Sequence, residues 1–205
     1  MIVEHVRRRR RQQQTRNWSS IVFSVYLAQV PSYVVSSWKI NSLLVGDTRR
    51  FNTDLFRPFI GYMSDLILND ENLFTNFRDQ QGPMKSSFTH SQQHIILGYR
   101  IAFFNLITFD TQTSYIAVAE RENQNKNHGK FDIYFLFRSH VPDGLILYRY
   151  AQGLNEYFAI GLRAGILALY IDFGFGKRLI VSDESTKLAD GQWHEVRVTK
   201  IGTDK

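Results

Sequence analysis

The stretch FDIYFLFRS (131–139) decides the fold, because large apolar side chains occupy every second position along it. In an extended chain, one side of this stretch would carry Phe131, Ile133, Phe135 and Phe137. A period of two is typical of a β-strand that buries one of its faces. The stretch therefore predicts a strand that packs against an apolar core.

Further strand candidates follow it at short intervals. The alternating or apolar runs are 145–148, 157–162, 166–173 and 193–199. The turn sequence Pro142-Asp143-Gly144 predicts a hairpin between the first two strands, and Arg163-Ala164-Gly165 predicts a second hairpin. Because no amphipathic pattern longer than about two helical turns interrupts these runs, the sequence predicts an all-β antiparallel sandwich.

Composition excludes several classes of protein. The chain has 205 residues, of which 43% are hydrophobic, and this is enough to bury a core and argues against disorder. Because the chain has no cysteine, it forms neither a disulfide nor a thiolate zinc site and has no cysteine nucleophile. It also lacks the run of about 18 apolar residues that a membrane-spanning helix needs.

The positive charge is concentrated at the start of the chain. Residues 1–16 hold six arginines and one glutamate, which is a net charge of +5 out of +6 for the whole chain. The run Arg7–Arg11 fits a solvated strand or loop, but clustered guanidinium groups also bind polyanions by releasing counterions. Because no basic surface with interleaved aromatic residues continues beyond this run, we expect no nucleic-acid partner. Polyanion or nucleic-acid binding is kept as the alternative function.

The apolar run 21–30 after these arginines has two interpretations. Its length fits the core of a targeting segment within residues 1–35. Polar residues separate it from the arginines, however, and Ser24 and Tyr26 alternate with its apolar residues. This alternation favours a strand.

Patterns typical of catalytic sites are weak. His90 and His94 have the spacing of a zinc-binding helix, but the residues between them supply no glutamate base. His194 is expected to be a structural residue of a strand. The sequence has no GxSxG motif, and Gly174 and Gly176 do not open a phosphate-binding helix. We therefore expect no enzymatic activity.

The second half of the chain carries several motifs in a characteristic order. They are FDIYFLFRSHVPDGLILY (131–148), YFAI (157–160), DFGFG (172–176) and DGQWHEV (190–196). Together they resemble the strand, turn and tryptophan-histidine motifs of the laminin G domain family. The resemblance implies a concanavalin-like antiparallel β-sandwich, a jelly roll, that acts in binding and cell adhesion.

The first half resembles the end of another laminin G domain. LLVG (43–46) and PFIGYMSDLILN (58–69) are similar to the closing strands of the family, and 106–118 resembles an opening strand. The resemblance implies two partial domains in a neurexin-like tandem: 1–70 as a C-terminal part, 71–104 as a linker and 105–205 as an N-terminal part. Each part lacks strands, so we expect the parts to complement each other within one chain, as in a circular permutant, or between chains.

The resemblance also implies site residues. A rim Ca²⁺ site of the family would use the Glu156 carboxylate and the Phe173 carbonyl, with further oxygen donors expected after Lys205. Tyr62 stands where the family has a cysteine in its closing strand. Independently of the family, Asn17 begins an N-glycosylation sequon, which has meaning in a secreted chain.

The family also implies a location and partners. We expect an extracellular or cell-surface location, such as the synapse, as part of a single-pass membrane protein. Neither a signal peptide nor a membrane helix is secure in this chain. The implied partners are cell-surface or extracellular proteins and glycans, with Ca²⁺ as the cofactor.

Overall fold

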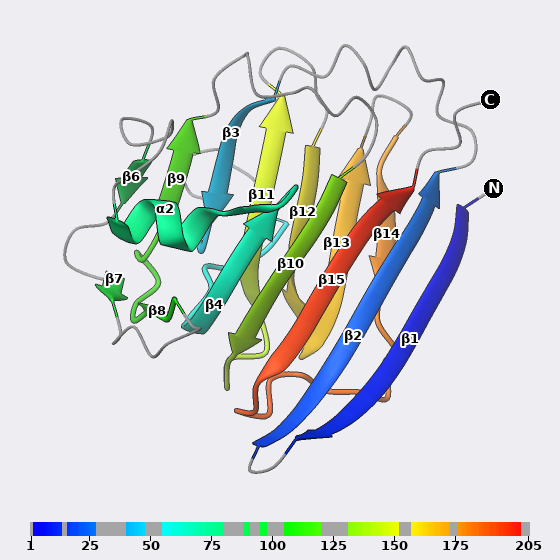
Figure 1. Cartoon of the computed structure of the whole chain (residues 1–205). Helices are drawn as coiled ribbons and strands as arrows, with labels where there is room; N and C mark the ends of the chain where they lie inside the picture. Colours follow the sequence, from blue (N-terminus) through cyan, green and yellow to red (C-terminus); the bar gives the residue numbers. More distant parts are fainter. Residues whose placement is uncertain are drawn as a thin grey trace.

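The computed structural model shows two β-sheets that face each other (Figure 1). It describes residues 2–13, 16–27, 40–47, 55–79, 88–90, 95–97, 105–119, 131–151, 157–172 and 176–201. Within these residues the fold is all-β apart from one short helix, α2 (Leu73–Asp79). The prediction of an antiparallel sandwich with two sheets is confirmed.

Sheet A contains eight strands. In sheet order they are β1 (Ile2–Gln13), β2 (Arg16–Leu27), β15 (His194–Ile201), β10 (Phe131–Arg138), β4 (Gly61–Leu68), β8 (Ile107–Phe109) and β7 (Ile95–Leu97), and β5 (Glu71–Asn72) pairs with β4 off this path. Its neighbouring strands are antiparallel except for β2 and β15, which run parallel.

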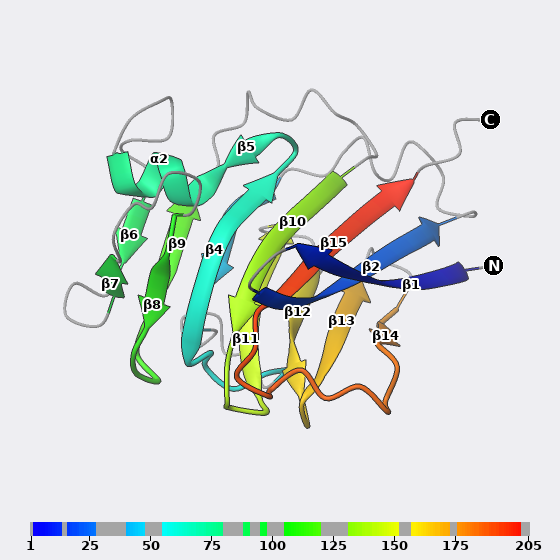
Figure 2. The same ribbon diagram turned by 60° about the horizontal axis from the view of Figure 1, so that its bottom comes forward.

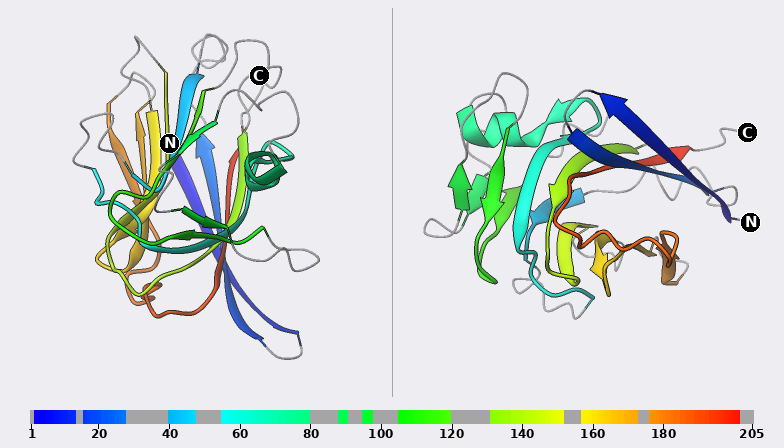
Figure 3. Two further views of the ribbon diagram at one scale, coloured as in Figure 1. Left: turned by 90° about the vertical axis from the view of Figure 1, so that its left-hand side faces the viewer. Right: turned by 90° about the horizontal axis from the view of Figure 1, so that it is seen from below.

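Sheet B contains seven antiparallel strands. In sheet order they are β14 (Arg178–Val181), β13 (Ile166–Asp172), β12 (Tyr157–Arg163), β11 (Gly144–Ala151), β3 (Ile40–Val45), β9 (Ile116–Ala119) and β6 (Phe88–His90). Figure 3 shows the two sheets face to face, with the β1–β2 hairpin projecting beyond one end of sheet A.

Strands from both halves of the chain share each sheet. In sheet A, β4 pairs with β10, so that Met63 lies opposite Phe137. In sheet B, β3 pairs with β11, so that Leu44 lies opposite Tyr148. The described residues therefore form one sandwich, and two separate partial domains are not shown. The boundaries at residues 70 and 105 stay a prediction about where two family repeats meet.

The core lies between the sheets and draws on both halves. Its fully buried side chains include Leu43, Phe59, Met63, Ile107, Phe135, Phe137, Phe158 and Val196. Ile133, Phe135 and Phe137 of β10 point into this core, which is the face that the period of two predicts. Removing this apolar surface from water is the main force that holds the two sheets together.

The predicted hairpin between 131–139 and 145–148 is wrong. Strand β10 pairs with β15 and β4 in sheet A, whereas β11 pairs with β12 and β3 in sheet B. The turn sequence 142–144 therefore carries the chain from one sheet to the other. Turn residues fix a local reversal, but only the core decides whether the returning strand lies beside the first or across from it.

The second predicted hairpin is confirmed. Strands β12 and β13 pair in register from Tyr157–Asp172 to Arg163–Ile166. Ala164 and Gly165 connect them with φ angles of 50° and 81°. Two consecutive residues with positive φ match the twist of the two strands, and glycine adopts this conformation at little cost.

A buried polar network anchors helix α2 to sheet A. The Asn72 side chain accepts hydrogen bonds from the amides of Phe74 and Thr75 and thereby caps the helix. Its Nδ2 donates to Asp65 Oδ1 at 3.2 Å, and Asn105 also lies within hydrogen-bonding distance of that oxygen.

Residues 71–104 were expected to be a linker. The structure places β5, α2, β6 and β7 within this range, and α2 covers one end of the sandwich (Figure 2).

The single sandwich predicts how a substitution in β4 affects the whole chain. Leu66 is 0% exposed in the core, and we expect Leu66→Ala to lower the free energy of unfolding by about 2–5 kcal/mol, through lost burial and a residual cavity. Leu179 of β14 is 46% exposed, so Leu179→Ala should change it by about 0.5 kcal/mol or less. The measurement is urea denaturation followed by circular dichroism and by tryptophan fluorescence. Two separate transitions, with Leu66→Ala shifting one alone, would contradict a shared core.

Candidate functional site

The predicted calcium site belongs to one end of sheet B. Strand β12 begins at Tyr157, β13 ends at Asp172, and these two residues are paired. The predicted ligands Glu156 and Phe173 are the next residues along the chain, and both lie outside the described residues. Because the pair is in direct register, the segments that lead to both predicted ligands leave the sheet at the same end.

Asp172 adds an acidic side chain at this end. The sequence motif contained this aspartate, but its place beside the start of β12 follows from the strand register and was not predicted. Burial raises the pKa of Tyr157 to about 12, and the neighbouring charge of Asp172 contributes to the shift. Among the described residues, no three histidine, aspartate or glutamate side chains are close enough together to hold a metal ion.

Aromatic side chains cover the outer face of sheet B beside this end. Tyr148 stacks on Tyr150 with ring centroids 5.8 Å apart, and it lies at the same distance from Tyr157. The Tyr157 hydroxyl is buried and has no hydrogen-bond partner. Next to this group, Phe56 meets Tyr170 edge to face at 5.4 Å. The cluster stiffens the strands that lead to the predicted site.

Phe56 reaches this face because Gly161 has no side chain. A Cβ atom at position 161 would lie 2.6 Å from the Phe56 ring and from the Gly144 carbonyl oxygen. The glycine therefore gives the chain segment before β4 a place to pack on the outside of sheet B. This contact ties the first half of the chain to a strand of the second half.

His194 is a structural residue, as expected. It is 2% exposed and packs against Phe137, with ring centroids 5.3 Å apart. Its Nε2 lies 2.8 Å from Asp190 Oδ1. Partial burial raises the pKa of the Asp190 carboxyl, but hydrogen bonds from the Gln192 amide and from His194 outweigh this effect and lower it. The histidine thus holds the turn before β15 against the core.

A second charged cluster joins β10 to β15 on the outer face of sheet A. The Asp132 carboxylate accepts hydrogen bonds from the guanidinium group of Arg197 and from the Thr199 hydroxyl. The bonds from Arg197 are the main reason why the pKa of Asp132 lies below its ordinary value. The Asn69 side chain accepts a further bond from the Asp132 amide at 3.0 Å. This arrangement fixes strand register and leaves no acid free for catalysis at this position.

The remaining predicted residues lie in strands or outside the described residues. Asn17 is in β2 opposite Gln12, next to the last pair of the β1–β2 hairpin, and glycosylation there stays a prediction. The run Arg7–Arg11 lies in β1, at the edge of sheet A. His90 is in strand β6, so it is not on a zinc-binding helix, and His94 lies outside the described residues.

Comparison with known proteins agrees with this sandwich. Residues 137–203 match the family model of the laminin G domain. The matched range includes β11–β15 and the end of β10, which supply strands to both sheets. Residues 137–203 are therefore similar to a laminin G domain, and laminin G domains are non-enzymatic binding modules. No solved structure matches the chain.

The chain is also distantly similar to a particular protein, neurexin-2. Neurexin-2 of mouse, of human and of rat is each 28% identical to it over 152 residues. The similarity covers 74% of this chain but 8% of the length of neurexin-2. It thus extends into the first half of the chain, where the sequence motifs were weaker.

The unpaired hydroxyl of Tyr157 predicts an unusual response to substitution. We expect Tyr157→Phe to leave the free energy of unfolding unchanged or to raise it by up to about 1 kcal/mol, because a buried polar group without a partner is removed. Tyr170→Phe is the matched control, because its hydroxyl accepts a hydrogen bond from Arg163 and should be worth about 0.5–1 kcal/mol. Denaturant unfolding of both variants measures this, and a larger loss for Tyr157→Phe would refute it.

The Asp132 cluster predicts acid sensitivity. The pKa of the Asp132 carboxyl in the folded protein is depressed below 3.8. The stabilisation by this carboxylate is therefore complete above that pH and disappears as the pH falls through the folded pKa. Asp132→Asn should lower the free energy of unfolding at pH 7 by up to about 1 kcal/mol, since the pair is partly exposed. The difference from the wild type should shrink as the pH falls below 3.8 and the Asp132 carboxylate becomes protonated in the folded protein. Asp110→Asn, at an exposed carboxylate, is the control in the same pH series of denaturation curves.

Proposed function

We propose that the chain is a non-enzymatic binding module of a neurexin-like, extracellular cell-adhesion protein that recognises partner proteins or glycans. The observation that carries this proposal is the laminin G match over residues 137–203, which include strands of both sheets. A rigid sandwich presents loops at its ends, and loops on a rigid scaffold commonly bind partners. The similarity to neurexin-2 supports a cell-surface location.

The binding end is the one at which β12 begins and β13 ends. Its sheet is stiffened by the tyrosines of its outer face, with Tyr148 and Tyr157 both largely buried. Asp172 contributes negative charge at the same end. A partner that binds here would meet loops whose ends are fixed by paired strands.

Calcium binding at this end is part of the proposal. Ca²⁺ takes about six to eight oxygen ligands and prefers carboxylates and backbone carbonyls. The Glu156 carboxylate and the Phe173 carbonyl would hold the ion, and Asp172 lies close enough along the chain to supply a further oxygen. The ion would neutralise these acids and order the loops for the partner.

Isothermal titration with CaCl₂ tests this site. We expect the full chain to bind Ca²⁺ and Glu156→Gln to weaken that binding at least about tenfold, because the variant removes the charged ligand. Glu184→Gln, at an exposed glutamate before β15, is the matched control and should bind like the wild type. Equal affinity of all three proteins would show that Glu156 is not a ligand.

Two further features belong to the proposal. Residues 1–70 and 105–205 would be parts of two family repeats that complement each other in one sandwich, because β4 and β3 pair with strands of the second part. The parent protein would be a single-pass protein of the cell surface. In the part of the chain that the structure describes, no helix has the length and apolar character to cross a membrane.

A second candidate function is polyanion binding by β1. Its arginines occupy an edge strand of sheet A, and the register places Arg7, Val22 and Arg197 in one row across three strands. Binding of heparin or DNA should weaken with salt by about 0.7–0.9 log units per log unit for each anionic contact. If the affinity for heparin or DNA does not change with salt concentration, polyanion binding is excluded. The proposed calcium-dependent binding is unaffected by that result.

A further inference from the structure

A row of side chains crosses the outer face of sheet A at the end opposite the predicted calcium site. Arg138 of β10 pairs with Tyr62 of β4, Tyr62 with Thr108 of β8, and Thr108 with Ile96 of β7. Trp193 directly precedes β15. Phe137 of β10 pairs with His194 of β15, and one further step of this register sets Trp193 opposite Arg138. We call these five residues the outer-face row. With about 4.8 Å between strands, it is about 19 Å long.

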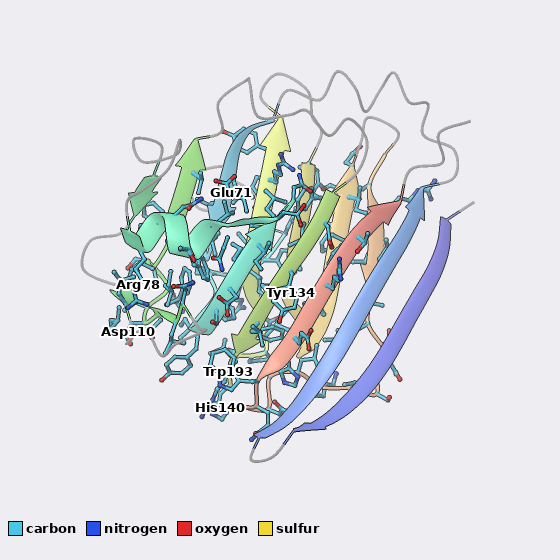
Figure 4. All side chains as sticks on the ribbon, viewed as in Figure 1. Glu71, Arg78, Asp110, Tyr134, His140 and Trp193 are labelled. Atoms are coloured by element: carbon cyan, nitrogen blue, oxygen red, sulfur yellow. The ribbon has the colours of Figure 1, made fainter. Side chains whose placement is uncertain are left out.

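Three members of the outer-face row, Arg138, Tyr62 and Ile96, are exposed although their strands border the core. Tyr62 is 42% exposed and Ile96 is 52% exposed, and both are among the few exposed large apolar side chains of the described residues. Their neighbours Phe137, Met63 and Ile107 point into the core and are completely buried. Figure 4 shows Trp193 at this end of sheet A, where β15 begins.

Arg138 is the one charged side chain among the five residues of the outer-face row. Its guanidinium carbon lies 5.7 Å from the centroid of the Tyr62 ring, so the ring holds the group in place by a cation–π contact. Arg138 takes part neither in the His194–Asp190 ion pair nor in the Asp132–Arg197 ion pair. Arg138 is exposed, so N–H donors of its guanidinium group are accessible from solvent.

The composition of the outer-face row is that of a protein-binding surface. Tryptophan, tyrosine and arginine are the residues most enriched where interfaces gain their binding energy. The row contains one of each, an exposed isoleucine, and no acidic residue.

We propose that the outer-face row binds an acidic segment of a partner protein, with a carboxylate on Arg138 and apolar side chains over Tyr62 and Ile96. The unpaired guanidinium is complementary to a carboxylate, and the two apolar residues would lose their exposure. A polyanion fits less well, because one arginine among apolar side chains offers a single anionic contact. This surface is separate from the calcium site and does not depend on it.

Selection from a random dodecapeptide phage library tests this proposal. The immobilised full chain is panned in EDTA, so that loss of calcium binding cannot affect the result. Enriched peptides are then synthesised with a fluorescent label, and their affinities are measured by anisotropy. We expect enrichment of peptides with aspartate or glutamate next to large apolar residues.

Paired variants locate the binding surface. Arg138→Glu and Ile96→Asp should each weaken the selected peptides at least about tenfold. Arg178→Glu and Leu179→Asp make the same changes at exposed residues of β14 in the other sheet and should leave affinity within about twofold of the wild type. Thermal unfolding checks that each variant is folded. If Arg138→Glu does not fold, Arg138→Gln takes its place.

Several outcomes would overturn the proposal. One is the absence of any enriched peptide, and another is enrichment of basic or purely apolar peptides. A third is equal binding by the wild type, Arg138→Glu and Ile96→Asp, which would place the peptides elsewhere on the molecule. Binding of heparin in place of peptides, lost in Arg138→Glu, would assign the row to polyanions and also contradict an acidic protein partner.

Discussion

The apolar layer between the two sheets is the constraint on which the rest of the structure depends. Phe135 and Phe137 of β10 enter it from sheet A, and Phe158 of β12 enters it from sheet B. Met63 of β4 belongs to the same layer, although it comes from the opposite half of the chain. Because burial of apolar surface has no direction along the sequence, the core joins whichever strands cover it best. Here that requirement draws both halves into one sandwich.

This shared core also separates two surfaces with different chemistry. At one end of sheet B, paired strands finish beside the acidic Asp172, which suits a cation and the loops around it. At the opposite end of sheet A, Arg138 and Tyr62 present a fixed positive charge with an aromatic ring. Both surfaces stand at the ends of strands whose neighbouring residues enter the core, among them Phe137 beside Arg138 and Phe158 beside Tyr157.

The strands and their buried faces were largely predictable, and their partners were not. The alternation at 131–139 placed β10 and its core-facing phenylalanines correctly, and the turn at 163–165 gave the β12–β13 hairpin. The proline turn at 142–144 gave a false hairpin, because a reversal of the chain looks the same whether it joins neighbours or opposite sheets. Of the candidate site, sequence motifs supplied Glu156 and Phe173, whereas Asp172 beside Tyr157 required the register.

The sequence by itself determined the class of the fold, the family that the second half resembles and the position of most strands, because these depend on local alternation and short motifs. Tertiary structure decided that β4 lies beside β10 and that β3 lies beside β11. It also decided that Arg138 lies on Tyr62, 76 positions away, in one exposed row with Ile96. Contacts of this kind depend on how all the strands together cover one core. A local sequence pattern contains no information about which strands become neighbours.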